Sequence, residues 1–261
     1  MNTAVLYASG LYFLFYAAMA ALYPFLNLYY QRMGLAGTQI GVLAAVPGIL
    51  NLFAASAWSA LADRFRFHRG LLTLTLLGVA VAGFAFSLST EFLPLLATAV
   101  VFALFLSPII PLMDSAALEI AKQAGTDFGH LRLWGTVGWI LAAWAFGFLV
   151  DRHFHYLFFA FAGLMVLAAG ASLFQPRRRW AWERPVREGA RQLLGRSDVR
   201  AFLVSALLLW ASSSGGSQFL SLYLSDIGAD GSIIGAAWAV AAVSEVPMLF
   251  FSGWWLRKLG H

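Results

Sequence analysis

Eight long apolar runs dominate this chain of 261 residues and leave few folds open to it. They cover approximately residues 4–29, 39–62, 71–90, 93–121, 131–151, 156–175, 201–225 and 232–256. A helix needs about 20 apolar residues to cross a bilayer, so each run is long enough for one span. Charged residues make up only 11% of the chain, against about 25% in soluble domains. We therefore predict an all-α membrane protein, because the alternating pattern of a membrane barrel is absent.

Lysine and arginine gather in the loops after the second, fourth, sixth and eighth runs, whereas the opposite loops carry only Arg32 and Arg152. By the positive-inside rule, this places the N-terminus in the cytoplasm, and we expect a bacterial-type plasma (inner) membrane. The net charge of +5 is explained by these loops, so we expect lipid and no nucleic acid as a partner. We also expect a monomer.

Reactive and metal-binding side chains are sparse. The chain has no cysteine, which excludes disulfides, iron–sulfur clusters and thiol catalysis. The five histidines show no pairing four residues apart on one helix, so we expect no metal site. We expect no cofactor of any other kind.

The region from residue 114 to residue 139 carries the most informative side chains. Asp114 lies in one apolar run and Arg132 in the next, joined by a polar turn at 124–130. A charge in hydrocarbon costs a contested ~2.5–17 kcal/mol, so an opposite charge at similar depth on the neighbouring helix is its natural partner. Trp139 follows Arg132 by two helical turns and shares its face. A carboxylate, a guanidinium and an indole on one polar face predict a solute site.

Further polar residues in the apolar runs are candidates for the same site. For Tyr16 and Tyr23, pore lining and simple packing are both open. Gln218 ends a Ser/Gly-rich stretch at 212–218, which indicates either a soft segment or a close-packing face. Glu245 lies near mid-bilayer, where a carboxyl group suits a proton carrier, the alternative being a neutral acid hydrogen-bonded inside the bundle.

Prolines and glycines mark irregular or close-packed helices. Pro108 and Pro111 precede Asp114 and predict a distortable segment beside that acid, as irregular backbone is tolerated where it lines a cavity. The fifth run contains glycines that let other backbones approach, at Gly135, Gly138 and Gly147.

The chain also repeats itself. When the sequence is shifted by 194 positions, the first two runs fall on the last two without a gap, and Gly34 meets Gly228. Parallel six-helix halves are a recognised transporter plan, with the solute site between them. We therefore expect a six-helix bundle at 1–175, a basic cytoplasmic linker at 176–198 and the start of a second bundle at 199–261. This predicts the N-terminal part of a longer protein of about twelve helices.

Two segments carry a resemblance to a known family. SALADRFRFHR at 59–69 resembles the loop between helices two and three of the major facilitator superfamily, and makes Asp63 and Arg64 its structural loop pair. GHLRLWGTVGW at 129–139, with Asp114 eighteen positions before its arginine, resembles the lactose permease group and the related phenylpropionate permease-like and nucleoside–proton symporters. The resemblance implies a major facilitator-type six-helix bundle plus the first two helices of the second bundle.

The same resemblance assigns roles. Arg132 and Asp114 look like the charge pair that engages solute in the lactose permease, and Trp139 looks like the tryptophan that stacks on the sugar ring. Glu245 is similar to the acid on helix eight that joins solute binding to proton coupling, and Asp114 is a second candidate for that coupling.

The first functional hypothesis is a secondary active transporter that couples protons to symport of a small organic solute by alternating access. The solute would be a sugar, an aromatic acid or a nucleoside. The second hypothesis is a membrane-embedded transferase using His68, His153 or His155, although no nucleophile–base pattern surrounds these residues. The third is a non-transporting truncated remnant.

Overall fold

The computed structural model describes residues 3–65, 68–174 and 195–251, together with 254 and 258. Its elements, in chain order, are α1 (Thr3–Arg32), α2 (Gly37–Phe65), α3 (His68–Ala85), η1 (Phe86–Leu88), α4 (Phe92–Leu106), α5 (Ile109–Ala124), α6 (Phe128–Val150), α7 (His155–Ser172), α9 (Ser197–Asp226), α10 (Gly231–Val243) and α11 (Val246–Phe250). All these elements are helical, which confirms the predicted fold class.

Seven of the described helical segments are long and apolar enough to cross a membrane. Three of them combine a pair of elements, namely α3 with η1, α4 with α5 and α10 with α11, and residues 37–51 of α2 form a shorter apolar helix. The side chains of Asp63 and Arg64 lie outside the described part of the chain, as do residues 176–194 of the predicted linker.

Two of the predicted runs are interrupted near a proline. The run at 93–121 divides into α4 and α5 at Pro108, and the run at 232–256 divides into α10 and α11 just before Pro247. Proline lacks an N–H donor and its ring clashes with the preceding turn, which favours a break there. Asp114 follows the first break and Glu245 lies in the second, so both predicted acids are near irregular backbone.

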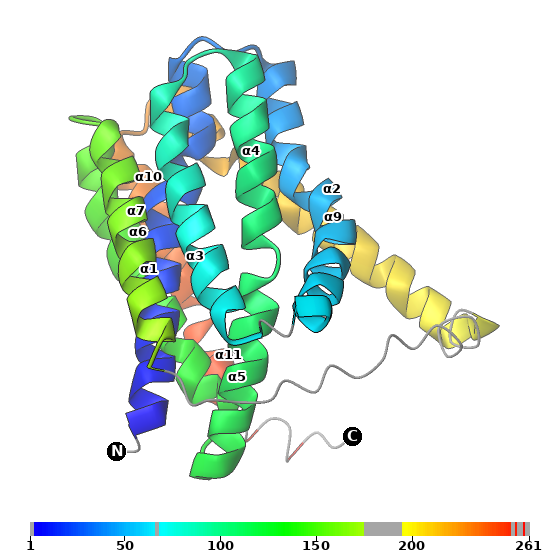
Figure 1. Ribbon diagram of the computed structural model, residues 1–261. Coiled ribbons are helices and arrows are strands. Elements are labelled where there is room, and N and C mark those ends of the chain that lie inside the picture. Colours follow the sequence, from blue (N-terminus) through cyan, green and yellow to red (C-terminus); the bar gives the residue numbers. More distant parts are fainter. Residues whose placement is uncertain (1–2, 66–67, 175–194, 252–253, 255–257, 259–261) are drawn as a thin grey trace.

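Helix α1 lies inside the bundle and packs mainly against α6 and α7 (Figure 1). More than half of its 30 residues are buried, among them Phe15, Phe25 and Tyr29. Gly138 of α6 lets that helix approach closely, because a Cβ atom there would collide with the backbone of Phe13. The predicted role of this glycine is therefore confirmed, and α1 and α6 form a closely packed pair at the centre of the bundle.

The internal repeat appears in the bounds of the helices. α1 and α9 each contain 30 residues, and each is followed by a turn with a left-handed glycine, Gly34 at φ 83° and Gly228 at φ 91°. Both following helices start at a glycine in equivalent positions, Gly37 for α2 and Gly231 for α10. The register that the sequence predicts for the repeat is thus confirmed.

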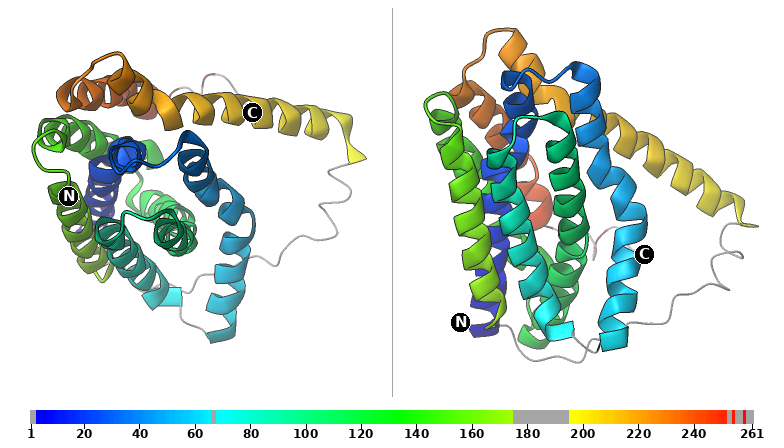
Figure 2. Two further views of the ribbon diagram at one scale, coloured as in Figure 1. Left: turned by 90° about the horizontal axis from the view of Figure 1, so that it is seen from above. Right: turned by 45° about the horizontal axis from the view of Figure 1, so that its top comes forward.

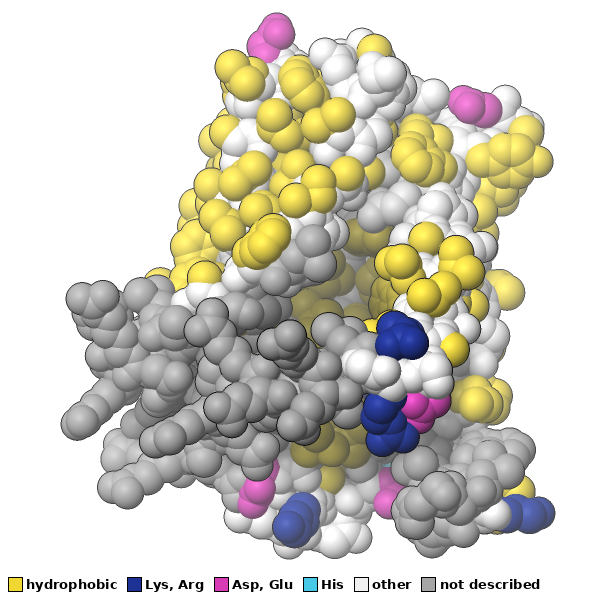
Figure 3. Space-filling view, turned by 90° about the vertical axis from the view of Figure 1, so that its right-hand side faces the viewer, with side chains coloured by type: hydrophobic (Ala, Val, Ile, Leu, Met, Phe, Trp, Pro, Cys, Tyr) yellow, Lys and Arg dark blue, Asp and Glu magenta, His cyan; other side chains and the backbone are white. Residues whose placement is uncertain are grey.

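We call the end of the bundle where α1 ends and α10 begins the upper end, which is the top of Figure 1. Helix α9 leans away from α2 towards the opposite, lower end (Figures 1 and 2). Its side-chain contacts with α1 lie near the upper end, where Asn27 donates to the Gln218 carbonyl at 2.7 Å and Gln31 donates to Asp226 at 3.2 Å. On the side that Figure 3 shows, hydrophobic side chains gather on the upper part of the described surface, whereas the Lys and Arg side chains lie in its lower half.

Candidate functional site

The predicted charges Asp114 and Arg132 come from the hairpin of α5 and α6. Gly125 ends α5 with a left-handed conformation at φ 65°, and α6 begins at Phe128, which confirms the turn predicted at 124–130. Both charged side chains are half-buried. The hairpin therefore brings them to the same region of the bundle interior.

Tyr12 of α1 lies between the two charges. Its hydroxyl donates a hydrogen bond of 2.6 Å to Oδ1 of Asp114. The guanidinium of Arg132 lies 5.7 Å from the centre of the Tyr12 ring and 4.2 Å from that of Tyr16. The electron-rich faces of these rings attract the cation in a desolvated setting.

The structure differs here from the simplest expectation of a direct ion pair. Among the described residues, no ion pair of 4.0 Å or less joins Asp114 to Arg132. The physical reason is Tyr12, which is 2% exposed and places its ring and hydroxyl within reach of both groups. The acid and the base are thus linked through a tyrosine from a third helix.

A cavity of about 220 Å³ lies beside Arg132. Both repeats contribute to its lining, which consists of Tyr16, Arg132, Thr136, Trp139, Trp238, Ala241, Ala242 and Glu245. Ligand pockets commonly have volumes of about 300–1,000 Å³, so this cavity suits a small solute or part of a larger one. It brings together four predicted site residues, namely Tyr16, Arg132, Trp139 and Glu245.

Three aromatic rings form one side of this region. The centre of the Trp139 ring lies 5.9 Å from that of Trp238 and 6.2 Å from that of Tyr23. Trp238 belongs to α10, and its indole N–H donates a hydrogen bond of 2.9 Å to the hydroxyl of Ser221 on α9. This bond fixes the orientation of the Trp238 ring, so the aromatic wall joins the first bundle to the second repeat.

Arg132 and Glu245 face the cavity from opposite repeats. Gly135 gives the arginine room, because a Cβ atom there would lie 3.1 Å from Nη1 of Arg132 and 2.7 Å from the Tyr16 ring. Glu245 is exposed and lies at the break between α10 and α11. A cation and a carboxyl group therefore border the same small space.

The remaining predicted residues do not line the cavity. Asp114 is bonded to Tyr12, and Tyr23 belongs to the aromatic wall and also contacts the side chain of Gln218. Gln218 uses its backbone carbonyl to accept a hydrogen bond from Asn27, which makes it part of the contact between α1 and α9.

Sequence reasoning left three residues out of the site, namely Tyr12, Thr136 and Trp238. The spacing on the helices places each of them on the same face as a predicted site residue. Thr136 follows Arg132 by one helical turn, and Trp238 precedes Glu245 by two, so each shares a face with a predicted residue. Tyr12 precedes Tyr16 by one helical turn, but its hydrogen bond to Asp114, 102 positions away, is not visible in that spacing.

Comparison with known proteins places these features in a family. The sequence model of the MFS_1 like family matches residues 5–261. The maltose permease of Geobacillus stearothermophilus is 32% identical over 241 residues, covering 91% of this chain and 61% of the permease. A probable 3-phenylpropionic acid transporter of Escherichia coli (strain K12) is 27% identical over 263 residues, covering 95% of this chain and 66% of that protein.

A solved structure is also similar. The crystal structure of the nucleoside transporter NupG matches with a TM-score of 0.80 at 18% sequence identity, over 99% of this chain and 68% of that one. At that identity the match shows the fold alone. The chain spans about three fifths to two thirds of the length of the curated relatives named here.

Proposed function

Because the chain belongs to the MFS_1 like family of the major facilitator superfamily, we propose that it serves secondary active transport of a small organic solute. It is an integral membrane protein. Its transport cycle would be proton-coupled symport by alternating access, with the solute site between the two repeats.

The observation that carries this proposal is the cavity that both repeats line. Arg132 and Trp139 come from the first bundle, whereas Trp238 and Glu245 come from the second repeat. A solute held there touches both parts at once, so its binding energy can favour one relative arrangement of the repeats over another. That dependence is what alternating access requires.

Each residue has a chemical role in the proposed site. The planar guanidinium of Arg132 can donate two parallel hydrogen bonds to a carboxylate or to neighbouring hydroxyls of the solute. The faces of Trp139 and Trp238 would pack against a ring of the solute. Glu245 would carry the coupled proton, since it borders the space that the solute fills.

Asp114 would act through Tyr12. The 2.6 Å hydrogen bond joins its carboxylate to a ring that also contacts the Arg132 cation. Protonation of Asp114 would remove a negative charge close to Arg132, and the arginine would then bind a solute anion more tightly. Asp114 is therefore our second candidate for proton coupling.

The solute class is drawn from the shape of the site and from the relatives. The relatives are named for maltose, 3-phenylpropionic acid and nucleosides, each of which contains a ring and polar groups. A wall of aromatic rings beside a guanidinium suits that combination. We propose a ring-containing polar solute, with the N-terminus of a monomeric protein in the cytoplasm of a bacterial-type cell.

Proton-driven uptake into proteoliposomes tests the proposal with the intact protein. The solutes are maltose, 3-phenylpropionate and uridine, each radiolabelled, with the pH gradient imposed or collapsed. Arg132→Ala should reduce uptake of the accepted solute by at least about 100-fold, because a bidentate charged contact is lost. Arg152→Ala is the matched control, since Arg152 is an exposed loop residue.

Normal uptake by Arg132→Ala would refute the assigned site. Uptake that does not depend on the pH gradient would refute proton coupling while leaving solute transport in place. The transferase alternative has no support from the relatives, which are a permease and transporters.

A further inference from the structure

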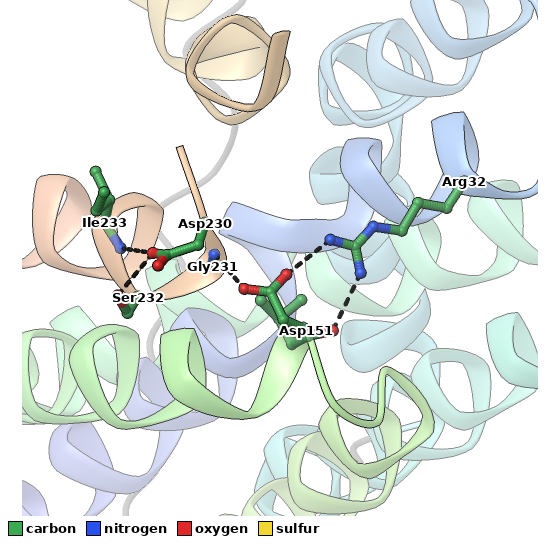
Figure 4. Close-up of polar contacts among 7 residues, drawn as sticks. Arg32, Asp151, Asp230, Gly231, Ser232 and Ile233 are labelled. Carbon is green, nitrogen blue, oxygen red and sulfur yellow. Dashed lines mark hydrogen bonds and ion pairs between the residues drawn. The ribbon is translucent and has the colours of Figure 1, made fainter. Parts of the chain in front are cut away.

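A group of polar contacts at the upper end joins the first bundle to the second repeat (Figure 4). Arg32, the last residue of α1, forms an ion pair of 2.8 Å with Oδ1 of Asp151 at the end of α6. The guanidinium also donates to the carbonyl of Val150 at 3.2 Å and lies 5.3 Å from the centre of the Phe154 ring. These contacts hold the Asp151 carboxylate in one orientation.

The second oxygen of Asp151 reaches the other repeat. Its Oδ2 accepts a hydrogen bond of 2.5 Å from the backbone N–H of Gly231, the first residue of α10. The first N–H groups of a helix have no partner within the helix, and its N-terminus carries a partial positive charge. A carboxylate of the first bundle thus caps a helix of the second.

A second carboxylate, that of Asp230 just before α10, also binds the start of this helix. Asp230 accepts hydrogen bonds from the Ile233 N–H at 2.9 Å and from the Ser232 hydroxyl at 2.7 Å. These two donors hold the pKa of the Asp230 carboxyl below its ordinary value. Asp230 accepts from the Ile233 N–H and Asp151 accepts from the Gly231 N–H, so the two carboxylates bind different N–H groups at the start of α10.

The backbones come unusually close just below this contact. A Cβ atom on Gly147 would lie 2.6 Å from the carbonyl oxygen of Gly231, and one on Gly235 would collide with the carbonyl oxygen of Ala143. The equivalent glycines of the first repeat, Gly37 and Gly41, have nothing within 4 Å of such an atom. The close crossing of α6 and α10 therefore depends on the glycines at 147, 231 and 235, where an added Cβ atom would meet the partner helix.

We propose that Asp151, oriented by Arg32, is a latch that keeps the upper end of the molecule closed. Separation of α10 from α6 would break the bond to Gly231 and move the carboxylate away from the positive end of α10. The energy of the latch is thus realised only when the two repeats are in contact at this end, so it favours that state. The inference concerns the position of the repeats and does not depend on the identity of the solute.

Distance measurements between spin labels test the latch directly. The chain has no cysteine, so cysteines introduced at Leu88 and Ile227 are the only labelling sites. These residues are 70% and 63% exposed and flank the upper end on the first bundle and the second repeat. In the intact protein in nanodiscs, we expect one short, narrow distance distribution between the two labels.

Asp151→Asn should shift this distribution. It keeps the size of the side chain but removes the charge that pairs with Arg32 and with the helix end. We expect the ratio of long to short distances to rise about tenfold, as for loss of a charge-assisted hydrogen bond. Arg32→Gln should cause a smaller shift in the same direction, because the carboxylate remains but is less firmly oriented.

Asp127→Asn is the matched control, since it makes the same change at the lower end of the same helix. All variants are first compared by gel filtration and circular dichroism, so that a misfolded sample is recognised. A distribution for both Asp151→Asn and Arg32→Gln identical to that of the parent would overturn the proposal. A parent distribution centred on the long distance would also overturn it.

A charge reversal distinguishes the contribution of the helix cap from that of the ion pair between Arg32 and Asp151. Arg32→Asp combined with Asp151→Arg restores opposite charges but places a cation at the N-terminus of α10, where it is unfavourable. We expect the long distances to persist in this double variant. Recovery of the short distance would show that the ion pair alone closes this end, and would overturn the assigned role of the cap.

Discussion

Helices α1 and α9 are equivalent in the repeat, yet their surroundings differ completely. Both have 30 residues and both end in a left-handed glycine turn. α1 buries more than half of its residues, whereas Ser221 is the buried residue within α9. The comparison teaches that the local sequence determines the length and the ends of a helix, while the neighbouring helices determine which of its side chains contribute to stability.

A pair of identical residues illustrates this difference. Tyr29 of α1 is 2% exposed and its hydroxyl donates to the Phe86 carbonyl at 3.3 Å, whereas Tyr223 at the equivalent position of α9 is 63% exposed. The same side chain therefore fills the core in one repeat, whereas in the other it has few neighbours among the described residues. Substitutions at equivalent positions can measure what the surroundings contribute.

The largest difference is expected for truncation of these tyrosines. Tyr29→Ala should lower the free energy of unfolding by about 3–5 kcal/mol because it leaves a large cavity. Tyr223→Ala should change it by less than about 0.5 kcal/mol, as is usual for surface positions. Titration with sodium dodecyl sulfate in mixed micelles, followed by circular dichroism, measures both values. Equal losses would contradict the contrast in burial.

A smaller difference is expected where a side chain is enlarged. Ala21 is fully buried, so Ala21→Leu should lower the free energy of unfolding by about 1–3 kcal/mol through overpacking. Gly215, its equivalent in α9, has nothing within 4 Å of an added Cβ atom. Gly215→Leu should raise the free energy of unfolding by about 0.5–1 kcal/mol, since leucine favours helix more than glycine does. The same titration would disprove this expectation if both substitutions changed the free energy of unfolding in the same direction.

The smallest effects are expected to be equal in the two repeats. Gly34→Ala and Gly228→Ala should each lower the free energy of unfolding by about 1 kcal/mol, because alanine is strained at positive φ. The melting temperature should fall with it. Gly48→Ala is the control, as Gly48 lies within α2 with open space around it. A clearly larger loss at one of the two turns would show that the turns are not equivalent.

Much of the fold could be predicted because its signals are local. Apolar length predicted the helices, Pro108 and Pro111 predicted a distortable segment where the structure has the break before α5, and the shift of the sequence predicted the equal bounds of α1 and α9. Pro247 was visible in the sequence, but the position of the break at Glu245 depends on the local hydrogen bonding of α10. The ends of several helices therefore differ from the predicted runs by a few residues.

The site was predictable only in part, since its contacts join distant segments. Arg132, Trp139 and Glu245 were identified because polar or aromatic groups in apolar helices are conspicuous, and the structure brings them to one cavity. The position of Tyr12 between Asp114 and Arg132 depends on how α1 packs against the hairpin, which no local pattern encodes. The contact of Asp151 with the N–H of Gly231 is equally invisible in the sequence, because every residue except proline has a backbone N–H and the sequence does not show which of them a distant carboxylate binds.

The crossing of α6 and α10 at Gly147, Gly231 and Gly235 has a mechanical consequence. Most helix pairs interlock their side chains, so turning one against the other requires several rotamers to change. At this crossing the facing atoms belong mainly to the backbone. We infer that a rotation of one helix about this crossing changes fewer side-chain rotamers here than it would at a crossing of interlocked side chains, so the three glycines make it a candidate pivot point.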